Sequence, residues 1–338
     1  MSARTAADTE NGDIVAEEDG LLAAYLLDGH GGGAEVEWGD VKRWTSDAGT
    51  LWVHLDYSHP EAARWLEEES DLDPAVAAVL AAEETRPRSV AGHGGLLVVL
   101  RGVNLNPGSD PEDMVAIRMW LDEHRIITTR RRHVKAIEAV RVSLLAGDGP
   151  STSSGFLVEV ADGLTTRIGT VLSELDDRVD ELEDEVLTAE SYELRSKIGS
   201  LRREIISLRR YLAPQRDAVA RLQNERVSWL DDVTRVYLRE IADRTTRYVE
   251  DLDSARDRAA VTQDELNSRL SERMNKTMYV LSIVAGIFLP LGLLTGLLGI
   301  NVGGIPGTEN SYAFLVVCGV LVLAAALQFV LFKRMHWL

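Results

Sequence analysis

The order of apolar and polar positions divides the chain into a mixed N-terminal part, a helical middle and an apolar end. Short apolar runs rich in branched residues have the composition of strands. They lie at 21–27, 50–57, 94–105, 114–122 and 124–131. Helices are predicted, from proline starts and a glycine stop, at 60–69, 74–84 and 134–147. Because strands and helices interleave, residues 21–150 are predicted to form an α/β domain, after a disordered acidic tail at 1–20.

The middle of the chain follows a glycine- and serine-rich linker at 147–155 and has apolar residues at every third or fourth position. This spacing predicts a helical bundle and stalk over 156–277. Pro214 is expected to kink one of its helices, because the ring removes a backbone donor. From about residue 230 no glycine or proline interrupts the pattern until Gly286. A helix that continued through the next apolar run would cover nearly 70 residues, roughly 100 Å.

The end of the chain holds two runs without charge, 278–298 and 312–332, each about 21 residues long. A helix of ~20 apolar residues crosses a bilayer core of ~30 Å. Buried core helices are the alternative, but charge-free runs of this length are uncommon in soluble proteins. We therefore predict transmembrane helices at 278–299 and 312–332, a periplasmic loop at 300–311 and a cytoplasmic tail at 333–338.

Basic residues predict how the spans are oriented. Arg273 and Lys276 precede the first span, and Lys333 and Arg334 follow the second. The loop between the spans carries Glu309 and no lysine or arginine. By the positive-inside rule both termini are cytoplasmic and the loop faces outward.

Composition and motifs exclude several classes of function. The formal net charge of −18 argues against a nucleic-acid partner. The HGGG stretch at 30–33 is similar to the oxyanion-hole loop of lipases, but the chain has no G-x-S-x-G nucleophile elbow and no phosphate-binding P-loop. An ordinary glycine-rich turn is therefore favoured, and no enzymatic activity is expected. The single cysteine, Cys318, lies in the second span, so no intrachain disulfide is possible.

Metal ligands are sparse. The histidines lack H-x3-H spacing and no C-x2-C occurs, so neither a closed zinc site nor a prosthetic group is expected. His54 and His59 flank a predicted strand end, where a structural role is favoured over a ligand pair. A dense group of carboxylates fits either a hydrated divalent cation or, preferably, a solvated helix face. Its members are Glu174, Asp176, Asp177, Asp180, Glu181, Glu183, Asp184 and Glu185.

The first span carries a stripe of mostly small or weakly polar residues at helical spacing. Its members are Asn275, Met278, Ser282, Ala285, Leu289, Gly292, Gly296 and Gly299. Such a stripe permits close helix contacts in lipid, and it equally lines a narrow pore when several copies surround an axis. Two spans cannot enclose a path alone, so a channel requires an oligomer. Pro290 is expected to loosen this span.

These features resemble the CorA superfamily of divalent-cation channels and transporters. Gly299, Ile300 and Asn301 stand where that family has Gly-Met-Asn, and GINVGGIPG with the KRMHWL ending resembles its ZntB branch of zinc transporters. Further similar stretches are LDGHGG (27–32), WVHLDYSH (52–59), ETRPR (84–88), VAIRMWLDEHRIITTRRRHV (115–134) and YLAPQRD (211–217).

The resemblance implies a homopentamer in the inner membrane, whose α/β domains form a cytoplasmic funnel and whose first spans line the pore. Asn301 is then expected in a ring at the outer mouth, where amide oxygens hold a hydrated cation. Glu309 either concentrates cations there or is an ordinary loop residue. Where family members often carry threonine this chain has Gly292, with Thr295 one turn further on.

The branch implies zinc transport coupled to protons. Ile300 leaves magnesium selectivity unsupported, yet a CorA-type magnesium, cobalt or nickel channel stays the main alternative. A membrane-anchored sensor or scaffold is the alternative of another class.

Overall fold

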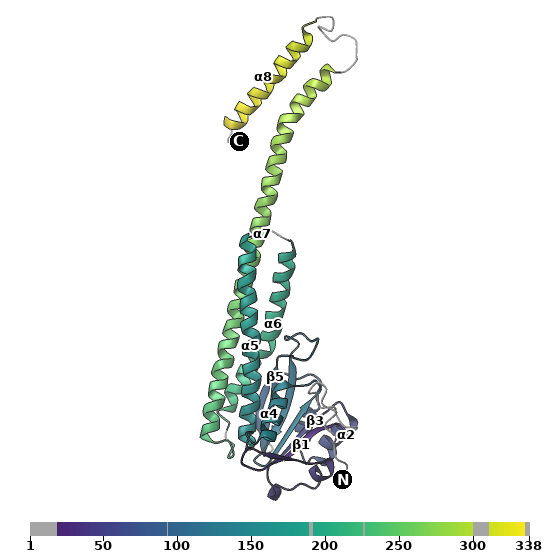
Figure 1. Ribbon diagram of the computed structural model, residues 1–338, viewed down its shortest axis with the longest axis vertical. Helices are drawn as coiled ribbons and strands as arrows, with labels where there is room; N and C mark the ends of the chain where they lie inside the picture. Colours follow the sequence, from purple (N-terminus) through teal and green to yellow (C-terminus); the bar gives the residue numbers. More distant parts are fainter. Residues whose placement is uncertain (1–18, 93, 189–191, 226, 300–310, 335–338) are drawn as a thin grey trace. The chain divides into compact units, whose positions relative to one another are not determined.

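The computed structural model describes residues 19–92, 94–188, 192–225, 227–299 and 311–334 (Figure 1). The chain divides into two compact units, Met1–Gln263 and Asp264–Leu338. The first unit contains a β-sheet and the helices that pack on it, and the second unit contains mainly apolar helical segments. The predicted fold class, an α/β part followed by long helices and two apolar spans, is confirmed.

The sheet of the first unit has seven strands in the order β2-β1-β3-β7-β6-β5-β4. Neighbours are antiparallel except β3 and β7, which run parallel with Asp56 opposite Arg130. The strands are β1 (Leu21–Leu27), β2 (Gly33–Glu35), β3 (Leu51–Asp56), β4 (Arg88–Gly92), β5 (Gly95–Gly102), β6 (Val115–Leu121) and β7 (Arg125–Arg130). Five of them occupy the predicted strand segments, whereas β2 and β4 were not predicted.

Both faces of the sheet are covered, because side chains alternate along each strand. In β6, Ile117 and Met119 face one buried core while Trp120 faces another. The first core packs against α4 (Lys135–Ala146) and parts of three longer helices. The second packs against three short segments and a π-helical turn. These are α1 (Trp38–Val41), α2 (Pro60–Arg64), η2 (Trp65–Glu69) and α3 (Pro74–Leu80).

Local signals explain where the short helices begin and end. The Asp73 side chain accepts a hydrogen bond from the backbone of Ala75, and Pro74 occupies the first turn of α3. Gly147 ends α4 with a φ of 82°, a left-handed conformation that glycine adopts without strain. A short 3₁₀ turn, η1 (Ser46–Ala48), precedes β3.

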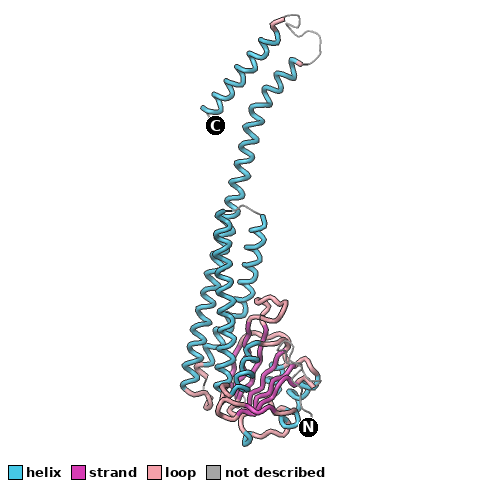
Figure 2. The backbone as a smooth tube through the Cα atoms, viewed as in Figure 1, coloured by secondary structure: helices cyan, strands magenta, loops and turns pink. Residues whose placement is uncertain are grey.

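Three long helices follow. They are α5 (Ser153–Thr188), α6 (Tyr192–Leu222) and α7 (Asp232–Leu298). In the first unit, α5, α6 and the N-terminal part of α7 lie side by side (Figure 2), buried through apolar residues at the predicted three- and four-residue spacing. Ser153 begins α5 inside the predicted linker, and α6 continues through Pro214. The helix α7 has 67 residues and includes Pro290, as the unbroken pattern predicted.

The second unit contains the C-terminal part of α7 and α8 (Ala313–Arg334), which lie beside one another (Figure 1). Both helices are long and apolar enough to cross a membrane. They approach closely at Gly286, where an added Cβ atom would lie 3.0 Å from the ring of Phe332. The domain boundaries predicted from the sequence stay predictions.

Candidate functional site

The predicted pore stripe lies on one exposed face of α7 in the single chain. The exposed members are Asn275, Met278, Ser282, Ala285, Leu289, Gly292, Gly296 and Gly299. Ile283 and Ile287, by contrast, are half-buried, as is Gly286 beside α8. At ~100° per residue, Ile283 and Ile287 lie largely opposite the centre of the stripe, whereas Gly286 lies about 80° from that centre. The remaining residues of the predicted mouth, Ile300, Asn301 and Glu309, lie outside the described residues.

The hydroxyl groups of Ser282 and Thr295 in this span donate hydrogen bonds to backbone carbonyl oxygens of their own helix. Ser282 Oγ donates to the carbonyl oxygen of Met278 at 2.8 Å, and Thr295 Oγ1 donates to that of Leu291 at 3.0 Å. A hydroxyl whose proton is held in this way presents only lone pairs outward. Ser282, the hydroxyl residue of the stripe, can therefore accept hydrogen bonds from water. Added Cβ atoms at Gly292 and Gly296 would meet nothing within 4 Å, so the backbone is open there.

The dense carboxylates of α5 meet an arginine from α7. Arg258 Nη1 donates to Asp176 at 2.9 Å, and its Nη2 donates to Glu183 at 2.7 Å and also to Asp180. These hydrogen bonds raise the pKa of Arg258, so its charge is fixed. Among the described residues no group of three or more metal-ligating side chains is placed to hold an ion. The arrangement favours a paired, solvated helix face over a cation site.

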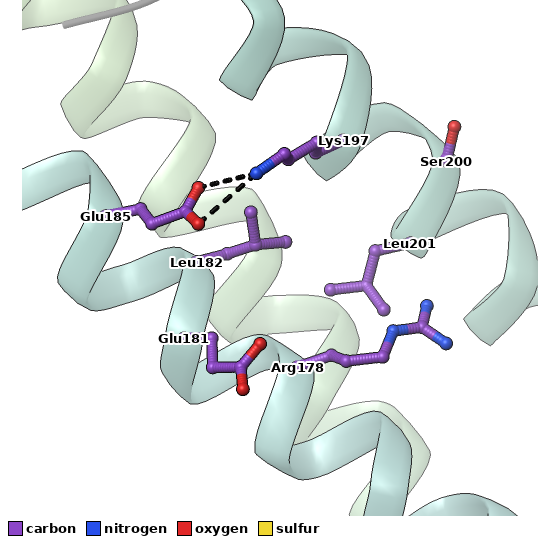
Figure 3. A pocket seen from close by; sticks show the side chains of 7 residues that line it. All are labelled: Arg178, Glu181, Leu182, Glu185, Lys197, Ser200 and Leu201. Atoms are coloured by element: carbon purple, nitrogen blue, oxygen red, sulfur yellow. Dashed lines mark hydrogen bonds and ion pairs between the residues drawn. The ribbon is translucent and has the colours of Figure 1, made fainter. Parts of the chain in front are cut away.

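A charged groove of about 260 Å³ lies between α5 and α6 (Figure 3). Lys197 Nζ lies 2.9 Å from a carboxylate oxygen of Glu185, and Leu182 and Leu201 lie between the helices. Both charged side chains are about half exposed, at 55% and 45%. Exposed pairs of this kind contribute about 0–1 kcal/mol each. We interpret the groove as helix packing edged by surface ion pairs.

The histidine and glycine motifs have structural roles. His54 is 1% exposed, and its Nδ1 lies 2.8 Å from Thr128 Oγ1. Burial, reinforced by the charge of Arg130, lowers the pKa of His54 well below its ordinary value of 6.5. In the HGGG loop, Asp28 Oδ1 accepts from the backbone N–H groups of His30 and Gly32, which also lower the pKa of Asp28. The favoured glycine-turn interpretation is confirmed.

One charged pocket was not predicted. It has a volume of about 230 Å³ and lies where the parallel strands β3 and β7 end, beside the end of α3. Four arginines contribute to its lining: Arg101, Arg118, Arg131 and Arg132. The signal available in the sequence was a lone arginine inside an apolar strand, VAIRMWL at 115–121.

Comparisons with known proteins agree with this architecture. Residues 47–334 match the family described as "CorA-like Mg2+ transporter protein". The chain is 41% identical over 332 residues to the "Divalent cation transporter CmaX" of Pseudomonas aeruginosa, covering 97% of this chain and 99% of that protein. It is 38% identical over 315 residues to the "Zinc transport protein ZntB" of Yersinia pseudotuberculosis, covering 93% and 95%.

Solved structures give the same result. The full-length CmaX structure superposes with a TM-score of 0.83 at 40% identity, covering 95% of this chain and 99% of that one. The CorA magnesium transporter of Methanocaldococcus jannaschii has a TM-score of 0.78 at 18% identity, covering 93% and 98%. The latter likeness shows the fold alone.

Proposed function

This chain belongs to the CorA-like family and is a divalent cation transporter, and we propose that the ion it carries is zinc. The observation that carries the proposal is the 38% identity to a protein named for zinc transport, sustained over 93% of this chain. The sequence motif agrees, because Ile300 replaces the methionine of the Gly-Met-Asn hallmark and the adjoining GINVGGIPG is similar to the zinc branch.

We further propose that five copies form the pore, with the stripe of α7 facing its axis. The exposure of the stripe in the single chain supports this arrangement, since it leaves the stripe free to face other copies. The lone pairs of Ser282 in the stripe suit the transit of a hydrated ion, whose water molecules donate hydrogen bonds outward. Asn301 would form the ring at the outer mouth, and both termini would be cytoplasmic.

Such a lining favours the passage of an ion that keeps its water molecules. Stripping water from a small divalent cation is costly, and amide or hydroxyl oxygens are weaker ligands than carboxylates. Neither span contains a carboxylate or a histidine. Coupling to protons, if it accompanies zinc, therefore uses titrating groups outside the spans.

The test is a flux assay on purified protein in liposomes that contain a zinc-sensitive dye or, separately, a magnesium-sensitive dye. We expect zinc entry that increases with an inward proton gradient. Magnesium flux without zinc flux would replace the proposal with a CorA-type magnesium channel. Absence of flux for both ions, in protein that is correctly folded, would favour a sensor or scaffold.

The mouth residue is tested in the same assay with Asn301→Ala. Asn310→Ala makes the same chemical change elsewhere in the loop and serves as the matched control. We expect the first variant to lose zinc flux and the second to keep it. The particle mass in mild detergent should be about five times 37.3 kDa for all three proteins. Unchanged flux in pentameric Asn301→Ala would refute the assignment of the mouth.

A further inference from the structure

The arginine-lined pocket at the ends of β3 and β7 has no role in the proposed ion path. Its walls come from elements far apart in sequence: Tyr57 follows β3, Arg131 follows β7, and Arg118 lies within β6. In open α/β sheets, ligands commonly bind beyond the carboxyl ends of parallel strands. Here β3 and β7 are the parallel pair.

Arg118 is the unusual member of the pocket. Its side chain is among the largest fully buried ones, at 2% exposure. Nη2 donates to the carbonyl oxygen of Glu83 at 3.1 Å and lies 3.4 Å from the hydroxyl of Tyr57, whose ring lies 4.6 Å from the guanidinium carbon. Its buried Nε has no hydrogen-bond partner, and within the described chain no carboxylate forms an ion pair with it.

A buried cation without a carboxylate is costly, since removal from water is repaid only by a close counter-charge. Burial lowers the pKa of Arg118, and the neighbouring charge of Arg101 lowers it further, while Tyr57 acts in the opposite direction. Arg101 is itself held by carbonyl oxygens, at 2.9 Å from that of Thr85 and 2.8 Å from that of Met114. Two guanidinium groups thus form a positive inner wall.

The carboxylates of the pocket lie at its exposed rim. Glu83 pairs with Arg131 and Asp113 pairs with Arg132, and these two acidic side chains are 75% and 62% exposed. The third carboxylate of the lining, Glu84, is also exposed. Exposed pairs are weak and screened by salt, so they do little to neutralise charge deeper inside. An incoming anion could therefore bind Arg131 and Arg132 in place of their exposed carboxylate partners with little loss of free energy.

We propose that this pocket binds a phosphate group, with the Arg118 guanidinium at its base and Arg131 at its rim. Guanidinium groups present paired N–H donors that match the oxygens of phosphate. The volume of about 230 Å³ is several times the ~30 Å³ share of one liquid water, so a phosphate and part of an attached organic group fit. The bound phosphate supplies the counter-charge that Arg118 lacks.

Isothermal titration calorimetry on the full chain in detergent tests the proposal, at constant ionic strength and with divalent ions removed. Inorganic phosphate is titrated first, and adenosine monophosphate forms a second arm. Saturable binding of either supports the site, and the preferred arm distinguishes free phosphate from a phosphate monoester. Absence of saturable binding in both arms overturns the proposal.

Variants locate the binding. Arg118→Met is expected to weaken it at least tenfold, and Arg131→Gln, at an exposed position that the fold tolerates, about threefold to tenfold. Arg125→Met is the matched control, because Arg125 is likewise an arginine stacked on a ring, 4.9 Å from that of Trp120, and is largely buried, but does not line the pocket. Unchanged binding in both pocket variants, or equal loss in the control, refutes the site.

Discussion

Acid should destabilise the N-terminal unit through His54. This residue is 1% exposed within β3, and its Nδ1 lies 2.8 Å from Thr128 Oγ1. Its Nε2 is buried and has no hydrogen-bond partner among the described residues. The charge of Arg130 adds repulsion to any proton that His54 would gain, so the folded protein holds the imidazole neutral.

The sign follows from the direction of the pKa shift. The pKa of His54 is well below 6.5 in the folded protein and returns to about 6.5 in the unfolded chain. Below pH 6.5 the unfolded chain binds more protons, so the stabilisation is complete above that pH and is lost as the pH falls. By pH 5.5 the loss is about 1.4 kcal/mol. In a unit of this size, that lowers the melting temperature by about 3–5 °C.

The assay compares apparent melting temperatures, by tryptophan fluorescence of the full chain in detergent, at pH 7.5 and pH 5.5. Other groups also titrate, so the informative quantity is how much each protein loses between the two pH values. His54→Gln should lose about 3–5 °C less than the wild type. His124→Gln, at an exposed position, is the control and should behave as the wild type does. Equal losses in wild type and His54→Gln would refute the reasoning.

Three further predictions concern stability. Arg258→Met should lower the free energy of unfolding by about 1–2 kcal/mol, because three carboxylates lose a shared partner; millimolar magnesium should then raise the melting temperature of the variant more than that of the wild type. Gly95→Ala should lower the free energy of unfolding by about 1–3 kcal/mol, because the new Cβ atom would lie 2.6 Å from the carbonyl oxygen of Leu121. Gly92, on the paired strand, is the control. A Cβ atom there meets nothing within 4 Å, so Gly92→Ala should keep the wild-type melting curve. Asp73→Ala removes the N-terminal cap of α3 and should lower the free energy of unfolding, measured by chemical denaturation, by about 1 kcal/mol. An unchanged denaturation midpoint would contradict this prediction.

Hydrophobic periodicity predicted most of the fold because long elements repeat their signal many times. The 67 residues of α7 and the 36 of α5 each repeat the helical spacing over many turns. The strands β5 and β6, buried on both faces, appear as nearly continuous apolar runs. Each such element carries enough apolar residues for its type to be predicted without knowledge of its neighbours.

The strands that escaped prediction lack this internal signal. The three residues of β2 include glycine and an exposed glutamate, and β4 reads RSVAG with alternate residues exposed. Both form the outer edges of the sheet, so each gains its backbone partners from one neighbouring strand only. Their structure depends on that pairing more than on their own composition.

The charged sites were predictable only in part for a similar reason. The crowding of carboxylates on α5 is plain in the sequence, but their partner Arg258 lies 82 positions beyond Asp176 and 75 beyond Glu183. The four arginines of the arginine-lined pocket likewise come from two strands and from the loop that follows a third. Spacing along one helix or strand cannot reveal which opposite charge the fold brings against it.

The pairing by Arg258 bears on how so acidic a chain handles cations. A divalent ion that settled on Asp176, Asp180 and Glu183 would have to displace a guanidinium hydrogen-bonded to all three. The displaced arginine, whose side chain is 32% exposed, would lose most of its counter-charge. These carboxylates are therefore committed to joining α5 and α7. Under the proposed function, the hydrated ion is left to weaker oxygen acceptors such as Ser282, which hold it loosely enough for passage.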